Sequence, residues 1–535
     1  MFKFFQSESK SIIGAATIIG VFSFVSRLIG FIRDRILAGT FGAGDTLDVY
    51  YAAFKIPDFM FGLIVVGALS ASFIPLFTKH YHSLRRDEAW KFTNNILTIT
   101  MCVMGGLCML GAVFSVQAAQ LIAPGFDADK QLAVASFMRI MLVAQVILSL
   151  STVFGSVLQS MKRFFLYALA PIFYNIGIIV GVVWFVDVLG PIGLAWGVVF
   201  GAFLHMLVQI VGCVSLGFVY KPFVDFASND ARMLIKLTGP RILGIAVNQV
   251  LFLFLTIIAT SMVSGSVTIL QFAYNIQFFP VGIFGVSLAV AAFPTFAEHL
   301  GSGDTKRFTE SFSVIVRQAL FFLIPTTLLF LMLRSQIVRV VVGAGAFDWS
   351  STILTANTLA FFALTFIPQS LIYILSRAFF AVHDTVTPLT AGCIGSFVGI
   401  ISVFLFKDTF GVVGLAMGYS LFALVNFILL WIPLRQRVGS LDEARIYKSL
   451  LILVVAGIVC VLLTQMVKPV LSHLVSLDTF FGVFLQGSVS GLLGLSGYLA
   501  VAWMLKSPEL SMFTGSLQRK FLRKIAPHES VPVQE

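Results

Sequence analysis

Long runs of apolar residues, separated by short polar connections, dominate the pattern along this chain. Most runs reach about 20 residues, the length that a helix needs to cross the hydrocarbon of a bilayer. The strands of a membrane β-barrel would instead be short and alternating. We therefore predict an all-α polytopic membrane protein with about fourteen transmembrane helices. The expected spans are 11–38, 48–78, 92–117, 132–158, 166–186, 192–215, 238–262, 267–296, 312–333, 353–375, 387–406, 412–434, 448–466 and 480–505.

Composition supports this class and excludes others. Of the 535 residues, 58% are hydrophobic and only 11% are charged, whereas a soluble globular protein is about 25% charged. Five cysteines in a chain of this length form no disulfide framework, and no Cys-x-x-Cys or histidine cluster suggests a metal site. The spans use up most of the length, so little chain is left for a soluble domain.

Lysines and arginines in the connections predict the orientation. With the N-terminus in the cytoplasm, the connections on that side carry 23 Lys and Arg, and those on the other side carry five. An even number of helices with both termini in the cytoplasm follows from this bias. The net charge of +11 is then a topology signal, and no nucleic-acid partner is needed to explain it. Residues 507–535 are expected to form a basic cytoplasmic tail, either a solvated anchor or a contact for anionic lipid.

Two halves of the sequence repeat each other at nearly one offset. Residues 187–197 reappear as 408–418, an offset of 221, and residues 53–56 match 273–276, an offset of 220. We expect two pseudo-symmetric six-helix lobes around a central cavity. Parallel repeats of this kind are typical of transporters, in which the binding site lies between lobes that rock against each other. The expected divisions are an N-lobe (1–237), a C-lobe (238–437) and two appended helices (438–506).

Ionisable residues inside the expected spans concentrate in the first hairpin. Such groups are costly in a bilayer, so they normally face a cavity or a partner. Arg27 and Asp34 are seven positions apart, as are Asp48 and Lys55, so each pair shares a helix face. Because arginine forks bind phosphate oxygens bidentately, we predict a cationic, partly neutralised site for an anion at Arg27, Arg33, Asp34, Asp48 and Lys55. For Lys55 and Asp48, intramolecular pairing is an equal alternative; for Arg33 the alternative is that Arg33, Asp34 and Arg35 mark a membrane interface, where they snorkel and pair among themselves.

The second lobe offers a neutral residue at the equivalent position. Asn275 stands where Lys55 stands in the first repeat, so it is included as a candidate binding residue. Walker-type, His-Glu-x-x-His and Gly-x-Ser-x-Gly motifs are absent, which indicates a transporter rather than an enzyme, without a cofactor. Its energy must come from a gradient, the membrane potential or a partner.

The charged residues stand in motifs that are similar to those of a known family. The motifs are Ser26-Arg27-Leu-Ile-Gly30-Phe-Ile-Arg33-Asp34, Phe41-Gly42-Ala-Gly44, Asp48, Ala53-Phe54-Lys55-Ile56-Pro57, Ala123-Pro124-Gly125-Phe126 and Leu375-Ser376-Arg377-Ala378-Phe379. They resemble the MurJ/MviN-type lipid II flippases of the MOP exporter superfamily, over about residues 10–505.

The resemblance implies a protein of the bacterial inner membrane, and we expect it to function as a monomer. It would move the undecaprenyl-pyrophosphate-linked peptidoglycan precursor from the cytoplasmic to the outer leaflet by alternating access. Arg27, Arg33, Asp34 and Asp48 match the family's cavity residues, and helices 13 and 14 would form a groove for the lipid tail. The implied partners are this precursor, membrane lipids and cell-wall synthesis proteins.

Two departures from the family pattern leave alternatives open. Phe61 and Asn275 occupy positions where the family commonly has arginines. A flippase for another polyprenyl-linked glycan, or a non-transporting scaffold of cell-wall synthesis, is therefore considered beside a lipid II flippase. A cation-coupled drug exporter is disfavoured, because such exporters usually have twelve helices and carboxylates in the cavity.

Overall fold

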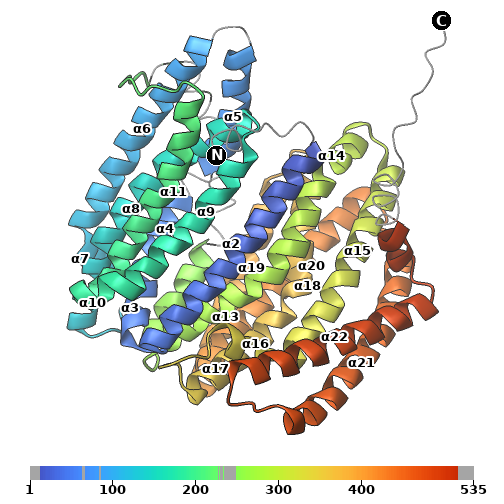
Figure 1. Cartoon of the computed structure of the whole chain (residues 1–535). Helices are drawn as coiled ribbons and strands as arrows, with labels where there is room; N and C mark the ends of the chain where they lie inside the picture. Colours follow the sequence, from blue (N-terminus) through green and yellow to red (C-terminus); the bar gives the residue numbers. More distant parts are fainter. Residues whose placement is uncertain are drawn as a thin grey trace, which may run out of the picture. The chain divides into compact units, whose positions relative to one another are not determined.

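The computed structural model describes residues 12–62, 67–82, 86–226, 228, 233 and 249–515. Within these ranges the secondary structure is helical throughout and contains no strand (Figure 1). Helices suit the bilayer because they satisfy every backbone hydrogen bond internally. The predicted all-α fold is confirmed for the described part of the chain.

The first half of the chain forms α2–α11. The bounds are α2 Ile12–Phe41, α3 Asp45–Ala53, α4 Lys55–Phe61, α5 Gly67–His82, α6 Arg86–Val113, α7 Ser115–Ile122, α8 Ala128–Ser160, α9 Phe164–Val180, η2 Gly181–Phe185, α10 Val186–Leu189, η3 Gly190–Ile192 and α11 Gly193–Ser215.

After a helix at Gln249–Thr260, the second half forms α13–α22. The bounds are α13 Ser266–Pro280, η4 Val281–Val286, α14 Ser287–Gly301, α15 Thr305–Met332, α16 Arg334–Val341, α17 Trp349–Leu364, α18 Phe366–Ala381, α19 Val386–Phe410, α20 Val412–Val438, α21 Glu443–Leu474 and α22 Phe480–Met504. A short helix at residues 508–515 follows α22.

Several expected spans are broken into shorter helices. The span expected at 48–78 is divided among α3, α4 and α5, and α17 and α18 meet at a bend of 41°. Within the described residues, nine helices are long and apolar enough to cross a membrane, or ten if the bent pair is one span. The multi-pass membrane class is thereby confirmed, and the number of fourteen spans remains a prediction. The beginning of the span expected at 238–262 lies outside the described residues.

Contacts divide the chain into two compact units. Unit 1 comprises Met1–Asn275, Val341–Thr358 and Gly392–Tyr419; unit 2 comprises Ile276–Val340, Leu359–Ala391 and Ser420–Glu535. These borders are not those of the lobes expected from the repeats, because helices from each half contribute to unit 1. The lobe division at 237 remains a prediction about symmetry.

Glycines bring α9, with η2 that continues it, into close contact with α11 of unit 1. A Cβ at Gly177 would lie 2.2 Å from the Gly201 Cα, and a Cβ at Gly181 would lie 2.4 Å from the Gly197 Cα. Such small residues at four-residue spacing allow helix backbones to approach in a membrane, where dispersion rather than hydrophobic burial holds helices together. Because α9 also packs against α2, this contact positions the charged first helix.

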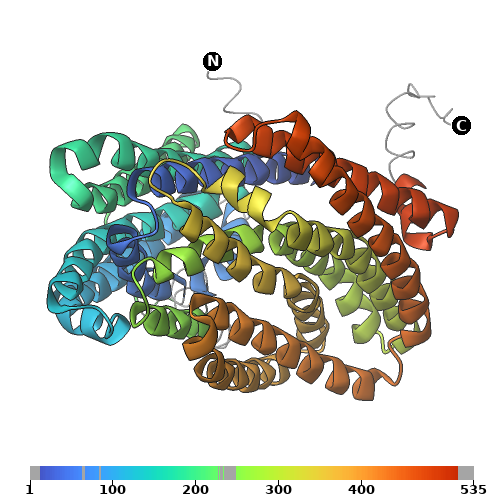
Figure 2. The ribbon, with the colours of Figure 1, turned by 90° about the horizontal axis from the view of Figure 1, so that it is seen from below.

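Unit 2 contains a phenylalanine-rich core and the two last long helices. Phe296, Phe308 and Phe312 are fully buried on α14 and α15. The helices α21 and α22, orange-red and red in Figure 2, pack against each other and against α15. Many apolar side chains of this pair remain exposed, for example Phe481 at 78% and Trp503 at 74%. Such exposure suits helices that face lipid tails.

Candidate polar site on α13

A stripe of polar side chains runs along one face of α13. Thr268, Gln271 and Asn275 follow a spacing of i, i+3, i+7, so they lie on the same side of the helix. Each contacts a residue of the first hairpin: Thr268 meets Asp48, Gln271 meets Lys55 and Asn275 meets Asp34. All six residues belong to unit 1. The predicted residues Asp34, Asp48 and Lys55 all contact this stripe.

At the start of the stripe, Asp48 caps α13. Its carboxylate oxygens accept hydrogen bonds from the backbone N of Gly265 at 2.7 Å and of Thr268 at 2.8 Å, and from the Thr268 hydroxyl at 2.6 Å. A carboxylate at a helix N-terminus satisfies backbone N–H groups that have no partner within the helix. Gly265 has φ +90, and a Cβ there would lie 2.5 Å from the Ala43 oxygen, so the turn requires glycine. Asp48 therefore fixes where α13 begins.

One turn further along α13, Gln271 meets Lys55. The Lys55 ammonium at the start of α4 donates to the Gln271 Oε1 at 2.8 Å and lies 4.5 Å from the centre of the Phe252 ring. An amide oxygen and an aromatic face both attract a cation without cancelling its charge. These two contacts hold the Lys55 side chain in place.

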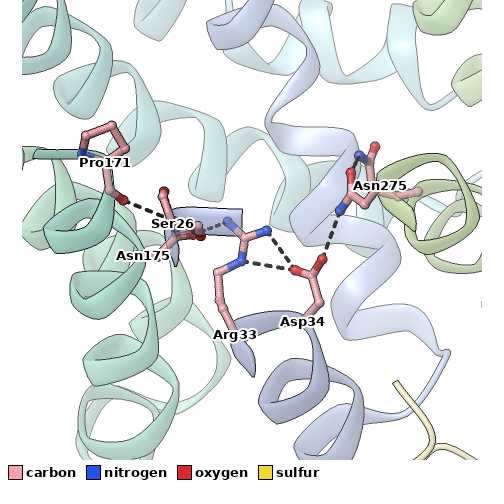
Figure 3. A network of polar contacts seen from close by, with 7 residues as sticks. Ser26, Arg33, Asp34, Pro171, Asn175 and Asn275 are labelled. Carbon is pink, nitrogen blue, oxygen red and sulfur yellow. Dashed lines mark hydrogen bonds and ion pairs between the residues drawn. The ribbon is translucent and has the colours of Figure 1, made fainter. Parts of the chain in front are cut away.

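The next turn carries the most connected part of the site, which Figure 3 shows. The Arg33 Nε and Nη2 both donate to the Asp34 Oδ1, at 3.0 and 2.7 Å, and its Nη1 donates to the Asn175 Oδ1 at 2.9 Å. Asn275 donates from its Nδ2 to the other oxygen of Asp34 at 3.1 Å. Asp34 is buried, with 3% of its side chain exposed against 21% for Arg33. The guanidinium is therefore fixed between a carboxylate on α2 and an amide on α9.

These contacts join into one chain of hydrogen bonds. Gln271 donates to the Asn275 Oδ1 at 2.9 Å, which connects the Lys55 contact to the Asp34 contact. Four of the six predicted site residues, Arg33, Asp34, Lys55 and Asn275, are thereby brought together. Two cations, Arg33 and Lys55, and the carboxylate of Asp34 thus belong to one network, and Asp58 places a second carboxylate close to Lys55.

The two remaining predicted residues lie beside this network. Asp48 lies on α3, with its oxygens directed at the start of α13, two turns before Asn275. Arg27 is half-buried on α2, about 9 Å before Arg33 along the helix axis. Ser26, its neighbour, lies 3.5 Å from the Asn175 amide nitrogen that also belongs to this region (Figure 3).

Ties at the end of α2 hold the same hairpin. The ammonium of Lys130, at the start of α8, lies 2.9 Å from the Asp45 Oδ2, and the Ser264 hydroxyl donates to the other Asp45 oxygen. The backbone N of Ala346 donates to the Gly39 oxygen at 2.8 Å. This end of unit 1 therefore links the α2–α3 turn to the start of α13 and to the segment after α16.

A hollow of about 340 Å³ lies elsewhere, in unit 2. It is formed at the start of α15 and the end of α20, and none of the six predicted residues lines it. The lining residues are Thr305, Lys306, Thr309, Glu310, Val438, Ser440, Asp442 and Arg445. Two cations and two carboxylates line it, so its charge favours no anion.

Three residues of the site were missed by the sequence reasoning. Thr268, Gln271 and Asn175 are neutral, and a search for charges in apolar spans passes over them. One signal was present: Thr268, Gln271 and Asn275 form a polar stripe at helical spacing in an otherwise apolar span.

A comparison with known protein families shows to which family the chain belongs. A family model described as "Lipid II flippase MurJ" matches residues 37–485. The chain belongs to the lipid II flippase MurJ family. A probable lipid II flippase MurJ of Thermotoga maritima is 30% identical over 489 residues, covering 91% of this chain and 95% of the relative. A second, from Buchnera aphidicola subsp. Acyrthosiphon pisum, is 28% identical over 486 residues, covering 88% and 94%.

Two solved structures have the same fold as this chain. A lipid II flippase MurJ in an inward closed conformation matches with a TM-score of 0.74 at 23% identity, over 91% of this chain and 98% of that one. An inward-facing multidrug resistance MATE family transporter of the MOP superfamily matches with a TM-score of 0.65 at 13% identity, over 78% and 96%. The fold is therefore that of MurJ and MATE transporters.

Proposed function

We propose that this chain translocates lipid II from the cytoplasmic to the outer leaflet of the bacterial inner membrane by alternating access. Membership of the lipid II flippase MurJ family supports the substrate. The chain would act as a transporter and not as an enzyme. The substrate is amphipathic: a diphosphate-bearing polar head on a long apolar chain needs both a cationic site and an apolar surface.

The observation that carries the proposal is the chain of contacts that links Arg33, through Asp34, Asn275 and Gln271, to Lys55. Arg33 offers the two N–H groups that are not bonded to Asp34 or Asn175, and Lys55 offers an ammonium held by a neutral amide. Guanidinium and ammonium groups are the usual ligands of phosphate oxygens. We propose that the diphosphate binds at Arg33 and Lys55, with Asp34 as counter-ion, Asn275 as a polar contact, Arg27 at the approach and Asp48 holding α13 in register.

The rest of the proposed architecture is the one that the sequence predicts. We propose fourteen spans with both termini in the cytoplasm, six-helix lobes at 1–237 and 238–437, and a tail-binding groove at 438–506. Residues 507–535 would be the cytoplasmic tail, of which 516–535 lie outside the described residues. The ties of Asp45 and Ala346 would then close the outer end of the transporter and open during the cycle.

A cellular experiment tests the transport role. Depletion of the protein from a strain without other flippases should trap lipid II in the inner leaflet, and re-expression should release it. The Arg27→Ala and Arg33→Ala variants should fail to complement while remaining in the membrane. Normal complementation by both variants would favour a scaffold, and preferential binding of another polyprenyl-linked sugar over labelled lipid II would change the substrate.

A further inference from the structure

Gln271 connects the two charged ends of the polar network. It accepts from the Lys55 ammonium with its Oε1 at 2.8 Å and donates to the Asn275 Oδ1 from its Nε2 at 2.9 Å. Asn275 in turn donates to Asp34 at 3.1 Å. No comparison and no sequence motif assigns a role to Gln271.

The direction of this chain of hydrogen bonds is fixed at both ends. An ammonium can only donate and an ionised carboxylate can only accept, so donors point from Lys55 towards Asp34. The residue in between must accept on one side and donate on the other. A glutamine meets this requirement; a glutamate has no donor for Asn275 when ionised, and a lysine or arginine has no acceptor for Lys55.

The neutrality of Gln271 has a second consequence. A carboxylate at the same place would form an ion pair with Lys55, and the charge of the ammonium would be cancelled before any anion arrived. An amide positions the ammonium by a hydrogen bond and adds no negative charge to that of Asp58, which lies one turn along α4 and already attracts Lys55. The Phe252 ring, 4.5 Å from the ammonium, acts in the same way.

We propose that Gln271 is a positioning residue of the diphosphate site: it holds the Lys55 ammonium towards the ligand without adding a negative charge beside it. This inference rests on the proposed function, because it assumes that Lys55 and Arg33 bind the diphosphate of the lipid carrier. Gln271 acts through Lys55 and need not touch the ligand itself. Affinity for the anion and stability of the fold should therefore respond differently to its replacement.

Three variants of the full-length protein separate these effects. Gln271→Glu adds the carboxylate that would cancel Lys55, and Gln271→Met removes the hydrogen bonds at similar volume. Gln159→Glu is the matched control, since it adds the same charge at the far end of α8, outside the network. Each is purified in detergent and measured for binding of undecaprenyl diphosphate at several salt concentrations, and for its melting temperature.

We expect Gln271→Glu to lose at least about tenfold in affinity and to show a weaker salt dependence of binding, with an unchanged or higher melting temperature. Gln271→Met should lose affinity by several-fold and melt lower. Gln159→Glu should bind like the wild type. A purely structural Gln271 would instead make affinity follow the melting temperature.

Two results would overturn these ideas in distinguishable ways. Wild-type protein that fails to bind undecaprenyl diphosphate overturns the proposed function together with this inference. Wild-type binding that Gln271→Glu leaves intact overturns the inference alone and leaves the flippase proposal standing.

Discussion

Asp48 accepts two hydrogen bonds from Thr268, one from the backbone N at 2.8 Å and one from the hydroxyl at 2.6 Å. The two residues are 220 positions apart, nearly the offset of the internal repeat, and both are buried. A carboxylate of the first repeat thus organises the first turn of the helix that carries Gln271 and Asn275. The position of the whole polar stripe depends on this contact.

Removal of this cap should destabilise the protein. Asp48→Ala leaves the buried N–H groups of Gly265 and Thr268 without an acceptor, at a cost of about 2 kcal/mol. We expect a lower melting temperature in detergent and reduced transport, because α13 loses its register. Asp48→Asn keeps one acceptor oxygen and should retain part of the stability. An unchanged melting temperature in Asp48→Ala would show that the cap contributes nothing.

The apolar pattern located the helices well and their breaks poorly. The spans expected at 412–434 and 480–505 correspond to Val412–Val438 and Phe480–Met504, but 48–78 is divided into three helices. Hydropathy reports where chain can lie in lipid, and it carries little information on where packing interrupts a helix. The interruption at Phe54 has a local cause instead, because Pro57 in the first turn of α4 has no N–H to donate to the Ala53 carbonyl.

The site was predicted where charge made it conspicuous. Arg33, Asp34 and Lys55 stand out because charges are expensive inside a membrane. Their neutral partners do not stand out, because a glutamine or asparagine in a helix attracts attention only when its contacts are known. Gln271 lies 216 positions from Lys55 in the sequence, so a local pattern does not reveal that contact. The direction of the hydrogen bonds in the network could therefore be derived only from the fold.

Arginine at position 33 should not be replaceable by lysine. Arg33 uses Nε and Nη2 for Asp34 and Nη1 for Asn175, and one ammonium cannot reach both in this geometry. We expect Arg33→Lys to lower affinity for lipid II by about tenfold or more, a change of roughly 1.4 kcal/mol. Arg307→Lys, at a side chain that is 73% exposed, is the control and should bind normally. Equal affinity in both variants would contradict a role for the guanidinium fork.

The close contact of α9 and α11 gives a prediction that separates packing from helix propensity. Gly181→Ala places a methyl group 2.4 Å from the Gly197 Cα, so the helices must separate, at a cost of about 1–3 kcal/mol. Gly105→Ala on α6 meets no atom within 4 Å and should gain up to about 1 kcal/mol from its higher helix propensity. Melting temperatures should therefore shift in opposite directions. A shift in the same direction would show that close packing does not set the α9–α11 distance.

The turn before α19 provides a pH-dependent contribution to stability. Burial alone would raise the pKa of Asp384, but hydrogen bonds from the Thr387 backbone and hydroxyl and the charge of Arg437 outweigh it, and the pKa is lowered. A lowered pKa in the folded state means that the stabilisation is present above the unfolded value, about 3.9, and is lost as pH falls through the folded value.

Asp384→Asn should accordingly lower the melting temperature by a constant amount between about pH 5 and 8, where the carboxyl group is ionised in both the folded and the unfolded state. The difference from the wild type should shrink below about pH 4. Asp408→Asn, at a side chain that is 79% exposed, is the control and should have little effect at any pH. A difference that grows on acidification would have the wrong sign for this mechanism.

A buried ion pair fastens the segment after α22 to α15. The Arg317 Nη1 lies 2.7 Å from the Glu509 Oε1, with 12% and 1% of the two side chains exposed, and the Ser507 hydroxyl donates to the other Glu509 oxygen at 2.7 Å. Removing one partner leaves a buried charge uncompensated, which typically costs about 3–5 kcal/mol. We expect Glu509→Ala to melt well below the wild type.

Replacing both partners tests whether the pair itself stabilises the fold. Arg317→Met combined with Glu509→Leu removes both desolvated charges at similar volume, and such exchanges are often neutral or stabilising. The double variant should therefore recover most of the stability that Glu509→Ala loses, as measured by its melting temperature in detergent. A double variant as unstable as the single one would mean that the pair contributes more than its burial costs, and that its attraction holds the end of the chain on α15.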